Sequence, residues 1–335
     1  MLHFDMAAIG RYDLMLQFFS VVLFCYVLRE VPMKFSVLIP AYNRENYIAA
    51  TIESVLAQTY GDFEIVVVDD ASTDRTVDVV RSFTDKRVNI YLHKKNTGQI
   101  GATKTAYEKA KGEIITLLDS DDLYHQTMLE KVKEKYDEDN DLNFVYVYTD
   151  FYYPDGSTRE NTRSSFEGNI YRDILKQGYL VNTSGITCKY DSFSFIEKID
   201  SVFSVNCSDD IICFTLAKNG KAGVVKEPLS LLRVGHPGRV SQSVKSTIPW
   251  IALYTSFKDD IIKYCGTSHY TKLLLRSIFR IEAAVDGARN ELALAACKDL
   301  LAVDNSPKVE RVLRLLENES MPGTVRLRML QHLIH

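Results

Sequence analysis

The chain has 335 residues, of which 46% are hydrophobic and 25% are charged, a mixture typical of ordinary globular proteins. This composition excludes a disordered chain, a fibrous repeat and a small disulfide-bonded domain. Its 40 basic and 44 acidic residues give a formal net charge of −4, which provides no overall cationic field for a nucleic acid. Length and composition therefore favour one large domain with an appended region, and no nucleic-acid partner.

The six cysteines form no CxxC pair and no paired Cys/His spacing. A zinc ribbon and a disulfide framework are therefore not indicated, and a reducing compartment is favoured. We predict a cytoplasmic location on this basis.

Residues 1–32 contain the most apolar run of the chain, from Leu14 to Leu28. This run is shorter than the ~20 residues needed to span a bilayer, and it includes Gln17 and Ser20. Because Met33-Lys34 immediately precedes the first predicted strand, we predict that residues 1–32 are an N-terminal extension produced by the choice of start site. A membrane-associating helix is the alternative.

From residue 35 the pattern alternates between short apolar strands and amphipathic helices. Strands are predicted at Phe35–Pro40, Ile65–Val68, Val88–Leu92 and Ile114–Leu118. Helices are predicted after Asn43 as a cap, around Val77–Phe83 and at Thr103–Lys111. Strands that are apolar on both faces belong in a parallel sheet covered by helices on both sides. The pattern therefore predicts a doubly wound α/β fold.

The second half of the chain changes from this alternation to a mixed and then a helical pattern. Predicted elements are a helix at Thr127–Tyr136, an alternating strand at Phe144–Tyr153 before a turn at Pro154–Gly156, a helix at Asp210–Lys218, and strands at Val224–Val225 and Leu229–Val234. From about residue 246 the pattern is helical. We predict an α/β domain over residues 33–240 and a helical C-terminal region over residues 246–335.

Polar and acidic loops follow three of the predicted strands. They are Pro40-Ala41-Tyr42-Asn43, the loop Asp69–Asp74, and Asp119-Ser120-Asp121-Asp122. In a parallel sheet these strand ends meet at one edge, where ligands bind. Carboxylates gathered there repel one another unless a cation joins them, and Mg²⁺ or Mn²⁺ also leaves positions for water and phosphates. The loops predict such a metal site, with helix caps or solvated turns as the alternative for any single loop.

These loops, together with the turn Asn96–Gly98 and the stretch that runs to Gly112, resemble the successive motifs of glycosyltransferase family 2. The resemblance covers roughly residues 34–240. It implies the GT-A fold, a Rossmann-like mixed sheet with helices on both faces, here followed by a C-terminal helical appendage. It also implies a metal-dependent, inverting glycosyltransferase with a nucleoside diphosphate sugar as donor, UDP-sugar being favoured. The implied acceptor is a saccharide or lipid-linked saccharide, in cell-surface polysaccharide or glycolipid synthesis.

The resemblance also implies roles for individual residues. Those assigned to the nucleotide are Pro40, Ala41 and Tyr42 around the base, Glu45 nearby, Asp70 at the base edge and Asp119 at the ribose. Asp121 matches the acid that coordinates a Mn²⁺ or Mg²⁺ ion on the diphosphate, with Asp119 and His236 as further metal candidates. Lys104 could replace a cationic donor contact, because Thr103 and Lys104 stand where the family has arginine and asparagine.

A general base is required because a sugar hydroxyl is a poor nucleophile until its proton is removed. In the family that base is an acid at a helix start downstream of the metal motif. The resemblance assigns this role to Asp210, with Asp209 in reserve. A favourable helix cap is the alternative for this acidic pair.

Two other functions and a membrane contact remain as alternatives. A sugar-phosphate nucleotidylyltransferase would have a glycine-rich basic loop after the first strand, which Ala41-Tyr42-Asn43 is not. A non-catalytic scaffold would bind nucleotide without transfer. Basic residues of the tail could contact anionic lipid at the inner face of the membrane, with a solvated face as the alternative. They are Lys308, Arg311, Arg314, Arg326 and Arg328.

Overall fold

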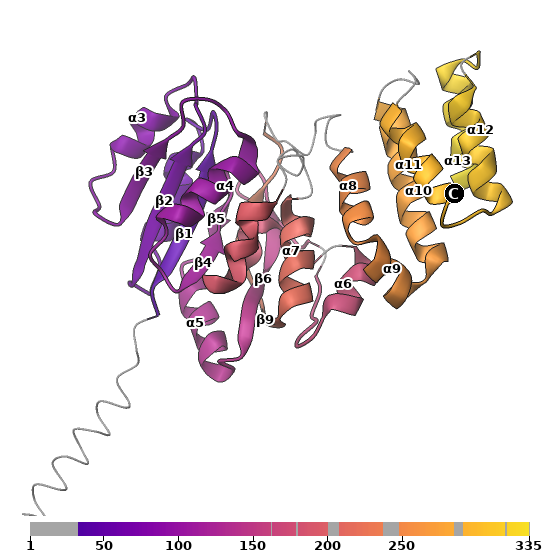
Figure 1. Cartoon of the computed structure of the whole chain (residues 1–335). Coiled ribbons are helices and arrows are strands. Elements are labelled where there is room, and N and C mark those ends of the chain that lie inside the picture. The colour runs from indigo at the N-terminus through magenta and orange to yellow at the C-terminus, as the bar shows by residue number, and fades with distance from the viewer. Residues whose placement is uncertain are drawn as a thin grey trace, which may run out of the picture. The chain divides into compact units, whose positions relative to one another are not determined.

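The computed structural model describes residues 33–161, 163–178, 180–199, 208–236, 248–284, 291–318 and 320–334 (Figure 1). The predicted N-terminal extension of residues 1–32 lies outside this described part, and so does the predicted domain junction at residues 240–246. The domain boundaries therefore stay predictions.

A mixed sheet of nine strands forms the centre of the fold. The strands are β1 (Phe35–Ala41), β2 (Phe63–Asp69), β3 (Val88–Leu92), β4 (Ile114–Leu117), β5 (Leu123–Tyr124), β6 (Leu142–Tyr152), β7 (Thr158–Arg159), β8 (Ile186–Lys189) and β9 (Lys221–Arg233). Their order is β3-β2-β1-β4-β8-β6-β9-β5, and β7 pairs with β6. Strands β1 to β4 pair in parallel, whereas β8 is antiparallel to both β4 and β6. The predicted mixed sheet is confirmed.

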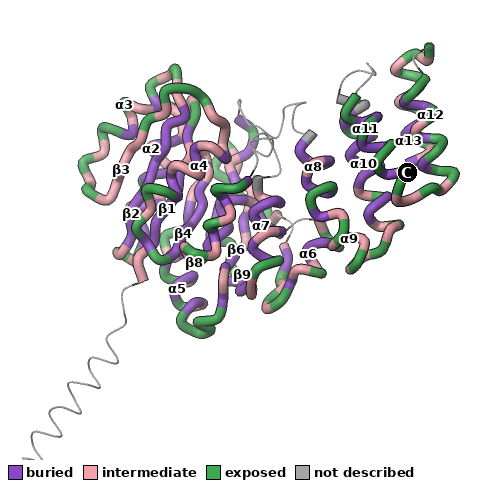
Figure 2. The backbone as a smooth tube through the Cα atoms, viewed as in Figure 1, coloured by how far each residue is buried: buried purple, intermediate pink, exposed green. Residues whose placement is uncertain are grey.

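Helices cover both faces of this sheet. In the α/β part they are α2 (Ile48–Leu56), α3 (Thr76–Arg81), α4 (Gly98–Lys109), α5 (Met128–Glu138), α6 (Tyr171–Gln177) and α7 (Ser208–Asn219), with 3₁₀ turns η1 (Thr183–Gly185) and η2 (Asp191–Lys198). Leu38 of β1 shares one core with Ile100 and Ala106 of α4. Val37 and Ile39, which are also buried, point to the opposite face because side chains alternate along a strand. Figure 2 shows the resulting buried strands between partly exposed helices.

The C-terminal region is helical, as predicted. Its helices are α8 (Ile248–Ser256), α9 (Lys258–Cys265), α10 (Thr267–Ala284), α11 (Glu291–Leu301), α12 (Pro307–Glu317) and α13 (Gly323–Ile334). Asp260 of α9 fastens this region to the α/β part. Its Oδ2 accepts hydrogen bonds from the Tyr171 hydroxyl of α6 at 2.6 Å and from Lys218 Nζ of α7 at 2.7 Å.

Two observations bear on contact with a membrane. No helix within the described ranges combines the length and the apolar composition needed to cross a bilayer. Arg326, one of the five basic residues considered for lipid contact, is only 3% exposed. A side chain enclosed by the helices cannot reach a lipid headgroup, so the prediction was wrong for Arg326.

Two local predictions differ from the structure. Asn43 does not cap α2, which begins at Ile48; it adopts a left-handed φ of 53° instead, and its Oδ1 accepts a hydrogen bond from Thr73 N. The strands predicted on either side of Pro228 form one strand, β9, whose pairing with β6 shifts register where Pro228 meets Tyr148. Proline lacks an N–H to donate, so the ladder is interrupted there without ending.

Candidate active site

The ends of β1 and β2 are tied together by hydrogen bonds between their loops. Asp70 N donates to the carbonyl oxygen of Ala41 at 2.8 Å. Glu45 N donates to Asp74 Oδ2 at 3.1 Å, and Glu45 Oε2 accepts from Arg75 Nε at 3.2 Å. Glu45, predicted to lie near the base, therefore holds the second loop against the first.

The base-pocket residues differ in exposure. Ala41 is buried at the end of β1 and Pro40 is partly buried, whereas Tyr42 is 43% exposed. A tyrosine ring that is open on one face can stack on a planar base. The Tyr42 side chain is thus accessible for the role that the sequence predicts.

Asp70 is surrounded by donors from its own chain. It is 3% exposed, and its two oxygens accept from Thr97 N at 2.9 Å and Gly98 N at 2.8 Å, while His93 Nδ1 lies 2.7 Å from Oδ1. The other ring nitrogen of His93 is 2.9 Å from Thr105 Oγ1. Asp70 therefore fastens the turn that precedes α4, and its predicted contact with the base edge stays a prediction.

Asp121, the predicted metal ligand, lies beside two side chains that can carry positive charge. Its Oδ2 is 3.3 Å from Arg44 Nε and 3.3 Å from His236 Nε2. Its backbone carbonyl accepts a 2.8 Å hydrogen bond from Arg233 Nε. The structure thus brings together Asp121 and His236, which are 115 positions apart by their residue numbers, at the end of β4.

Asp119 and Asp122 of the same loop have different surroundings. Gln99 Nε2, at the start of α4, donates to Asp119 Oδ1 at 2.9 Å. Burial raises the pKa of the Asp119 carboxyl well above its usual range, and the charges of Asp122 and Asp209 add to this rise. Binding of a cation near Asp119 is therefore favoured, because the cation offsets the repulsion among these neighbouring carboxylates.

The residues present fit a divalent metal ion. Asp121 offers a carboxylate oxygen, and His236 offers an imidazole nitrogen on the same side of the loop. Among the residues that the structure describes, no three His, Cys, Asp or Glu side chains gather into a complete metal cage. Mg²⁺ does not require one, because it commonly uses one or two protein ligands and takes the rest from water and phosphates. Asp121 would hold such an ion, with His236 and Asp119 next to it.

The two acids at the start of α7 lie in different environments. Asp209 Oδ1 accepts a hydrogen bond from the Thr183 hydroxyl of η1, and the charge of Asp209 contributes to the raised pKa of Asp119. Asp210 is 6% exposed, and within the described part of the chain its Oδ1 has no hydrogen-bond partner. Burial, and then the neighbouring charge of Asp209, raises the pKa of the Asp210 carboxyl well above its usual range. The charge of Asp209 thus acts on Asp119 of the metal loop, whereas the Asp210 side chain is buried.

Lys104, predicted as a cationic donor contact, has a partner within the chain. Its Nζ donates a 2.8 Å hydrogen bond to the carbonyl oxygen of Ile199. A lysine has two further N–H donors, so this bond does not prevent a second contact. Its role toward a donor stays a prediction.

Several residues that shape the site were missed in the sequence. They are Arg44, His93, Gln99, Thr183 and Ser184. Arg44 follows Asn43 directly, and a cation beside an acidic site is a signal that could have been used. Thr183 and Ser184 lie in a stretch without legible periodicity, and only the tertiary fold brings them to the site.

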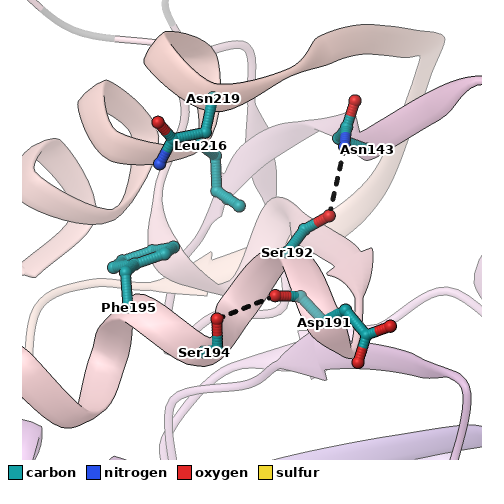
Figure 3. A pocket seen from close by; sticks show the side chains of 7 residues that line it. All are labelled: Asn143, Asp191, Ser192, Ser194, Phe195, Leu216 and Asn219. Atoms are coloured by element: carbon teal, nitrogen blue, oxygen red, sulfur yellow. Dashed lines mark hydrogen bonds between the residues drawn. The ribbon is translucent and has the colours of Figure 1, made fainter.

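A separate pocket of about 290 Å³ lies near the opposite end of the strands from the candidate site (Figure 3). It is lined by Asn143, Asp191, Ser192, Ser194, Phe195, Leu216 and Asn219. Asn143 stands at the beginning of β6, whereas the candidate site lies at the ends of strands that run parallel to it. The pocket is therefore not part of the candidate active site.

The fold and the site define a class of protein. A mixed sheet covered by helices on both faces is the arrangement of the GT-A fold. Residues 36–199 match the model of glycosyl transferase family 2, the family that the sequence motifs resemble. The GT-A fold predicted from the sequence is confirmed.

Two curated relatives and one solved structure illustrate the similarity. TuaG of Bacillus subtilis, named for teichuronic acid biosynthesis, is 33% identical over 143 residues, which cover 42% of this chain and 56% of TuaG. WfgD of Escherichia coli, a UDP-Glc:alpha-D-GlcNAc-diphosphoundecaprenol beta-1,3-glucosyltransferase, is 42% identical over 95 residues, which cover 28% of this chain and 38% of WfgD. The crystal structure of S. aureus TarS 1-349 with UDP-GlcNAc is 19% identical, with a TM-score of 0.65 over 90% of this chain and 91% of that chain.

The match to curated relatives is partial in length. This chain spans between 21% and 65% of the length of four uncharacterized glycosyltransferases from Rickettsia and Nostoc that it matches. The TarS structure, at 19% identity, supports the fold and not the substrate.

Proposed function

We propose that this chain is a metal-dependent, inverting glycosyltransferase of cell-surface polysaccharide or glycolipid synthesis. It transfers a sugar from a nucleoside diphosphate sugar, with UDP as the favoured nucleotide, to a hydroxyl of a saccharide or lipid-linked saccharide. The names of the relatives support this assignment, because WfgD uses UDP-Glc and a diphosphoundecaprenol-linked acceptor, and TuaG is named for teichuronic acid biosynthesis.

One observation carries the proposal. Asp121 lies 3.3 Å from both Arg44 Nε and His236 Nε2, and Asp209 lies close enough for its charge to raise the pKa of Asp119. A loop whose carboxylates attract cations can bind a metal ion together with the diphosphate that the ion coordinates. A second carboxylate, set apart from the first, can serve as a base. Sugar transfer to a hydroxyl needs these two groups.

The donor would be held at the ends of β1, β2 and β4. Tyr42 stacks on the base, Asp119 contacts the ribose, and Asp121 with His236 holds a Mn²⁺ or Mg²⁺ ion on the diphosphate. When bound, the ion neutralises negative charge on the departing nucleoside diphosphate. Arg44, 3.3 Å from Asp121, provides a further positive charge on the same side of the loop.

The acceptor is activated by a carboxylate at the start of α7. The acceptor hydroxyl oxygen forms a bond to the anomeric carbon as the bond from that carbon to the diphosphate oxygen breaks. The hydroxyl proton passes to the carboxylate, and the nucleoside diphosphate leaves with the bonding electron pair. Attack from the face opposite the leaving group inverts the anomeric configuration.

Asp210 is the carboxylate proposed as this base, with Asp209 in reserve. A general base works best when its pKa lies near the operating pH, and burial moves the pKa of a carboxyl in that direction. Asp210 is buried and its pKa is raised well above the usual range, whereas Asp209 is half-buried and accepts a hydrogen bond from Thr183. The surroundings of Asp210 therefore support the order predicted from the sequence.

The direct test is turnover of UDP-sugars with Mn²⁺ by the full chain and by two matched variants. Asp210→Asn should keep donor binding and lose transfer by roughly 10²- to 10⁴-fold, because the amide cannot take the proton. Asp209→Asn should retain more of the activity. If Asp209→Asn is inactive and Asp210→Asn turns over normally, the two roles are exchanged. If the wild type neither binds nor hydrolyses any nucleotide-sugar, the glycosyltransferase proposal fails.

Two further proposals concern the ends of the chain. We propose that residues 1–32 are dispensable, so a chain that starts at Met33 should keep its activity on a soluble acceptor.

We also propose peripheral membrane contact through α12 and α13, where Arg311 and Arg328 are exposed and Met329 is 44% exposed. Co-sedimentation with anionic but not with neutral vesicles would support this contact. Equal recovery with both vesicle types would contradict it.

A further inference from the structure

Three side chains form a cluster on one face of β6, near the carboxyl end of this strand. We propose that this β6 cluster, made of Tyr148, Asp150 and Arg163, binds hydroxyl groups of a neutral sugar of the acceptor, next to the proposed base Asp210. The cluster would then select the acceptor. This inference rests on the proposed function, in which the acceptor is a saccharide.

The side chains of the β6 cluster hold one another in place. Arg163 Nη2 donates a hydrogen bond to Asp150 Oδ1 at 2.8 Å, and the guanidinium carbon of Arg163 lies 5.0 Å from the centre of the Tyr148 ring. A guanidinium at this distance from an aromatic ring is attracted to the face of the ring. Tyr148 and Asp150 are two residues apart in β6, so they point to the same side of the sheet. Both contacts therefore orient Arg163.

The segment that carries Arg163 is attached to the same face of β6. The Tyr146 hydroxyl donates to the carbonyl oxygen of Ser164 at 3.2 Å and to that of Phe166 at 2.9 Å. Tyr146 is 1% exposed and belongs to the hydrophobic core. Because a core residue of β6 holds the two residues that flank position 165, the fold itself presents Arg163 to the site.

The segment is also linked to the acids at the start of α7. Asn161 Nδ2, two positions before the arginine of the cluster, donates to Asn182 Oδ1 at 3.1 Å. The next residue, Thr183, donates from its hydroxyl to Asp209 Oδ1. Two hydrogen bonds and two short stretches of chain thus connect the β6 cluster with Asp209 and its neighbour Asp210.

Strand β6 reaches the same turn, Thr183–Gly185, from the cluster itself. A Cβ added at Gly185 would come within 2.9 Å of Thr149 Oγ1, and Thr149 lies between Tyr148 and Asp150 in the chain. A 3₁₀ turn rises by only about 2 Å per residue, so its two ends are close together. The β6 cluster and the acids of α7 are therefore neighbours around one short turn, and one acceptor can contact both.

The hydrogen-bonding groups of the cluster suit a sugar. The side chains of Arg163 and Asp150 are 27% and 14% exposed, so both can reach a ligand. The Asp150 carboxylate makes no hydrogen bond besides the one from Arg163 within the part of the chain that the structure describes. A carboxylate accepts a hydrogen bond from a hydroxyl, and a guanidinium donates one to a hydroxyl oxygen. The pair can therefore bind two neighbouring hydroxyls of one sugar ring.

The charge of the cluster disfavours an anionic sugar. Glu160 Oε1 lies 3.1 Å from Arg163 Nε, so one cation faces the two carboxylates of Asp150 and Glu160. A phosphate or uronate at this position would be repelled by the unbalanced carboxylate, because juxtaposed like charges are unfavourable. A neutral, hydroxyl-bearing sugar is the class of ligand that fits.

The experiment measures saccharide binding to the full chain in the presence of UDP and Mn²⁺. The probes are the methyl glycosides of glucose, galactose, mannose and N-acetylglucosamine, and methyl glucuronide as the anionic probe. Saturation-transfer NMR titration gives each affinity. We expect at least one neutral glycoside to bind, and removal of single hydroxyls from it to weaken binding by about 10-fold or more at the positions that contact the cluster. The glucuronide should bind more weakly than the neutral glucoside.

Two variants test the residues, each with a matched control. Asp150→Asn should weaken binding of the neutral glycoside by about 10-fold, since the charged acceptor is lost, yet leave the glucuronide bound as well as before or better, because the repulsion is removed. Arg163→Met should weaken both probes. Asp141→Asn and Arg81→Met change exposed residues and should bind like the wild type. Thermal unfolding and metal-dependent UDP binding show whether each variant is folded.

The inference is overturned if the wild type binds none of the neutral glycosides, or binds every deoxy derivative as tightly as the parent glycoside. Both results need no variant and so do not depend on how the variants fold. It is also overturned if folded Asp150→Asn keeps the wild-type affinity or weakens the neutral and anionic probes equally. A wild type that neither binds nor hydrolyses any UDP-sugar contradicts the proposed function. Donor hydrolysis together with unaffected glycoside binding in both variants contradicts only the role of the β6 cluster.

Discussion

Arg44 Nε lies 3.3 Å from Asp121 Oδ2, so a cation of the chain itself faces the acid predicted to bind the metal. Both side chains are largely buried, at 15% and 14% exposure, and solvent therefore screens their interaction only in part. Arg44 offsets the repulsion among the carboxylates of this loop before any ligand is bound. A divalent ion at Asp121 must share the carboxylate with it.

The first prediction concerns this sharing. Arg44→Ala should lower the stability of the metal-free protein and tighten Mn²⁺ binding by several-fold, on the order of 1 kcal/mol, because a competing positive charge is removed. Titration calorimetry with Mn²⁺ alone measures the affinity. Arg159→Ala, which removes an exposed arginine of β7, should leave the affinity unchanged. Weaker Mn²⁺ binding by Arg44→Ala would show that Arg44 supports the metal site and does not compete with the ion.

The second prediction concerns Asp121 itself. UDP should bind tightly only with Mn²⁺ or Mg²⁺, and Asp121→Ala should abolish that dependence while the fold is retained, because the carboxylate is the main protein ligand of the ion. Calorimetry with UDP in the presence of Mn²⁺ or of EDTA measures the dependence. Asp155→Ala, in an exposed turn, is a control. Equal UDP affinity of the wild type in Mn²⁺ and in EDTA would contradict the prediction.

The third prediction concerns the pH dependence of stability. The pKa of Asp210 is raised in the folded protein by burial and by Asp209, relative to an unfolded value of about 3.9. The folded state therefore binds this proton more tightly. The stability contributed by protonated Asp210 is fully present below about pH 4 and is lost as pH rises through the higher folded-state pKa.

Asp210→Asn stays neutral, so its free energy of unfolding relative to the wild type should increase with pH, by at most about 1.4 kcal/mol per pH unit. Urea denaturation from pH 4 to pH 8 measures this difference. Asp141→Asn, at an exposed position, is the matched control and should show a flat difference. A flat difference for Asp210→Asn would mean that Asp210 ionises in the folded protein as readily as in the unfolded chain.

The fourth prediction concerns the support of Asp70 by His93. His93→Ala should lower the free energy of unfolding by about 1–3 kcal/mol, because it leaves a buried carboxylate with one partner fewer. It should also raise the donor KM, since Asp70 holds the turn before α4. His125→Ala removes an exposed histidine and should have little effect on either quantity. Unchanged stability of His93→Ala in urea denaturation would contradict the proposed support.

The parallel half of the sheet could be predicted because its strands are buried on both faces. Ile65–Val68 and Ile114–Leu118 are continuous apolar runs that only a helix-covered parallel sheet accommodates. Acids that follow such strands are carried to one edge of the sheet, and Asp119 and Asp121 were predicted as site residues for that reason. Asn43 was misassigned because asparagine suits both a helix cap and a left-handed backbone, and here it takes the second with φ of 53°.

The remaining features depend on tertiary contacts that leave no local signal. Strand β8 has four residues, too few to show a period, and pairs with strands far from it in the sequence. Asp209 and Asp210 are neighbours on a helix, so their side chains diverge by about 100°, and the sequence does not say which one faces the site. The contact of Asp209 with Thr183 and the burial of Asp210 are set by the tertiary fold.

The contacts of Asp260 bear on how the helical region could be exchanged between proteins. One carboxylate oxygen of Asp260 accepts hydrogen bonds from Tyr171 and from Lys218, and Lys218 lies in the last turn of α7, the helix whose first turn contains Asp209 and Asp210. A chimera that attaches a different set of helices must therefore supply an acid at this position. Without it, the partly buried Tyr171 of α6 and the exposed Lys218 of α7 lose a common partner, and the exchange disturbs the catalytic domain as well as the junction.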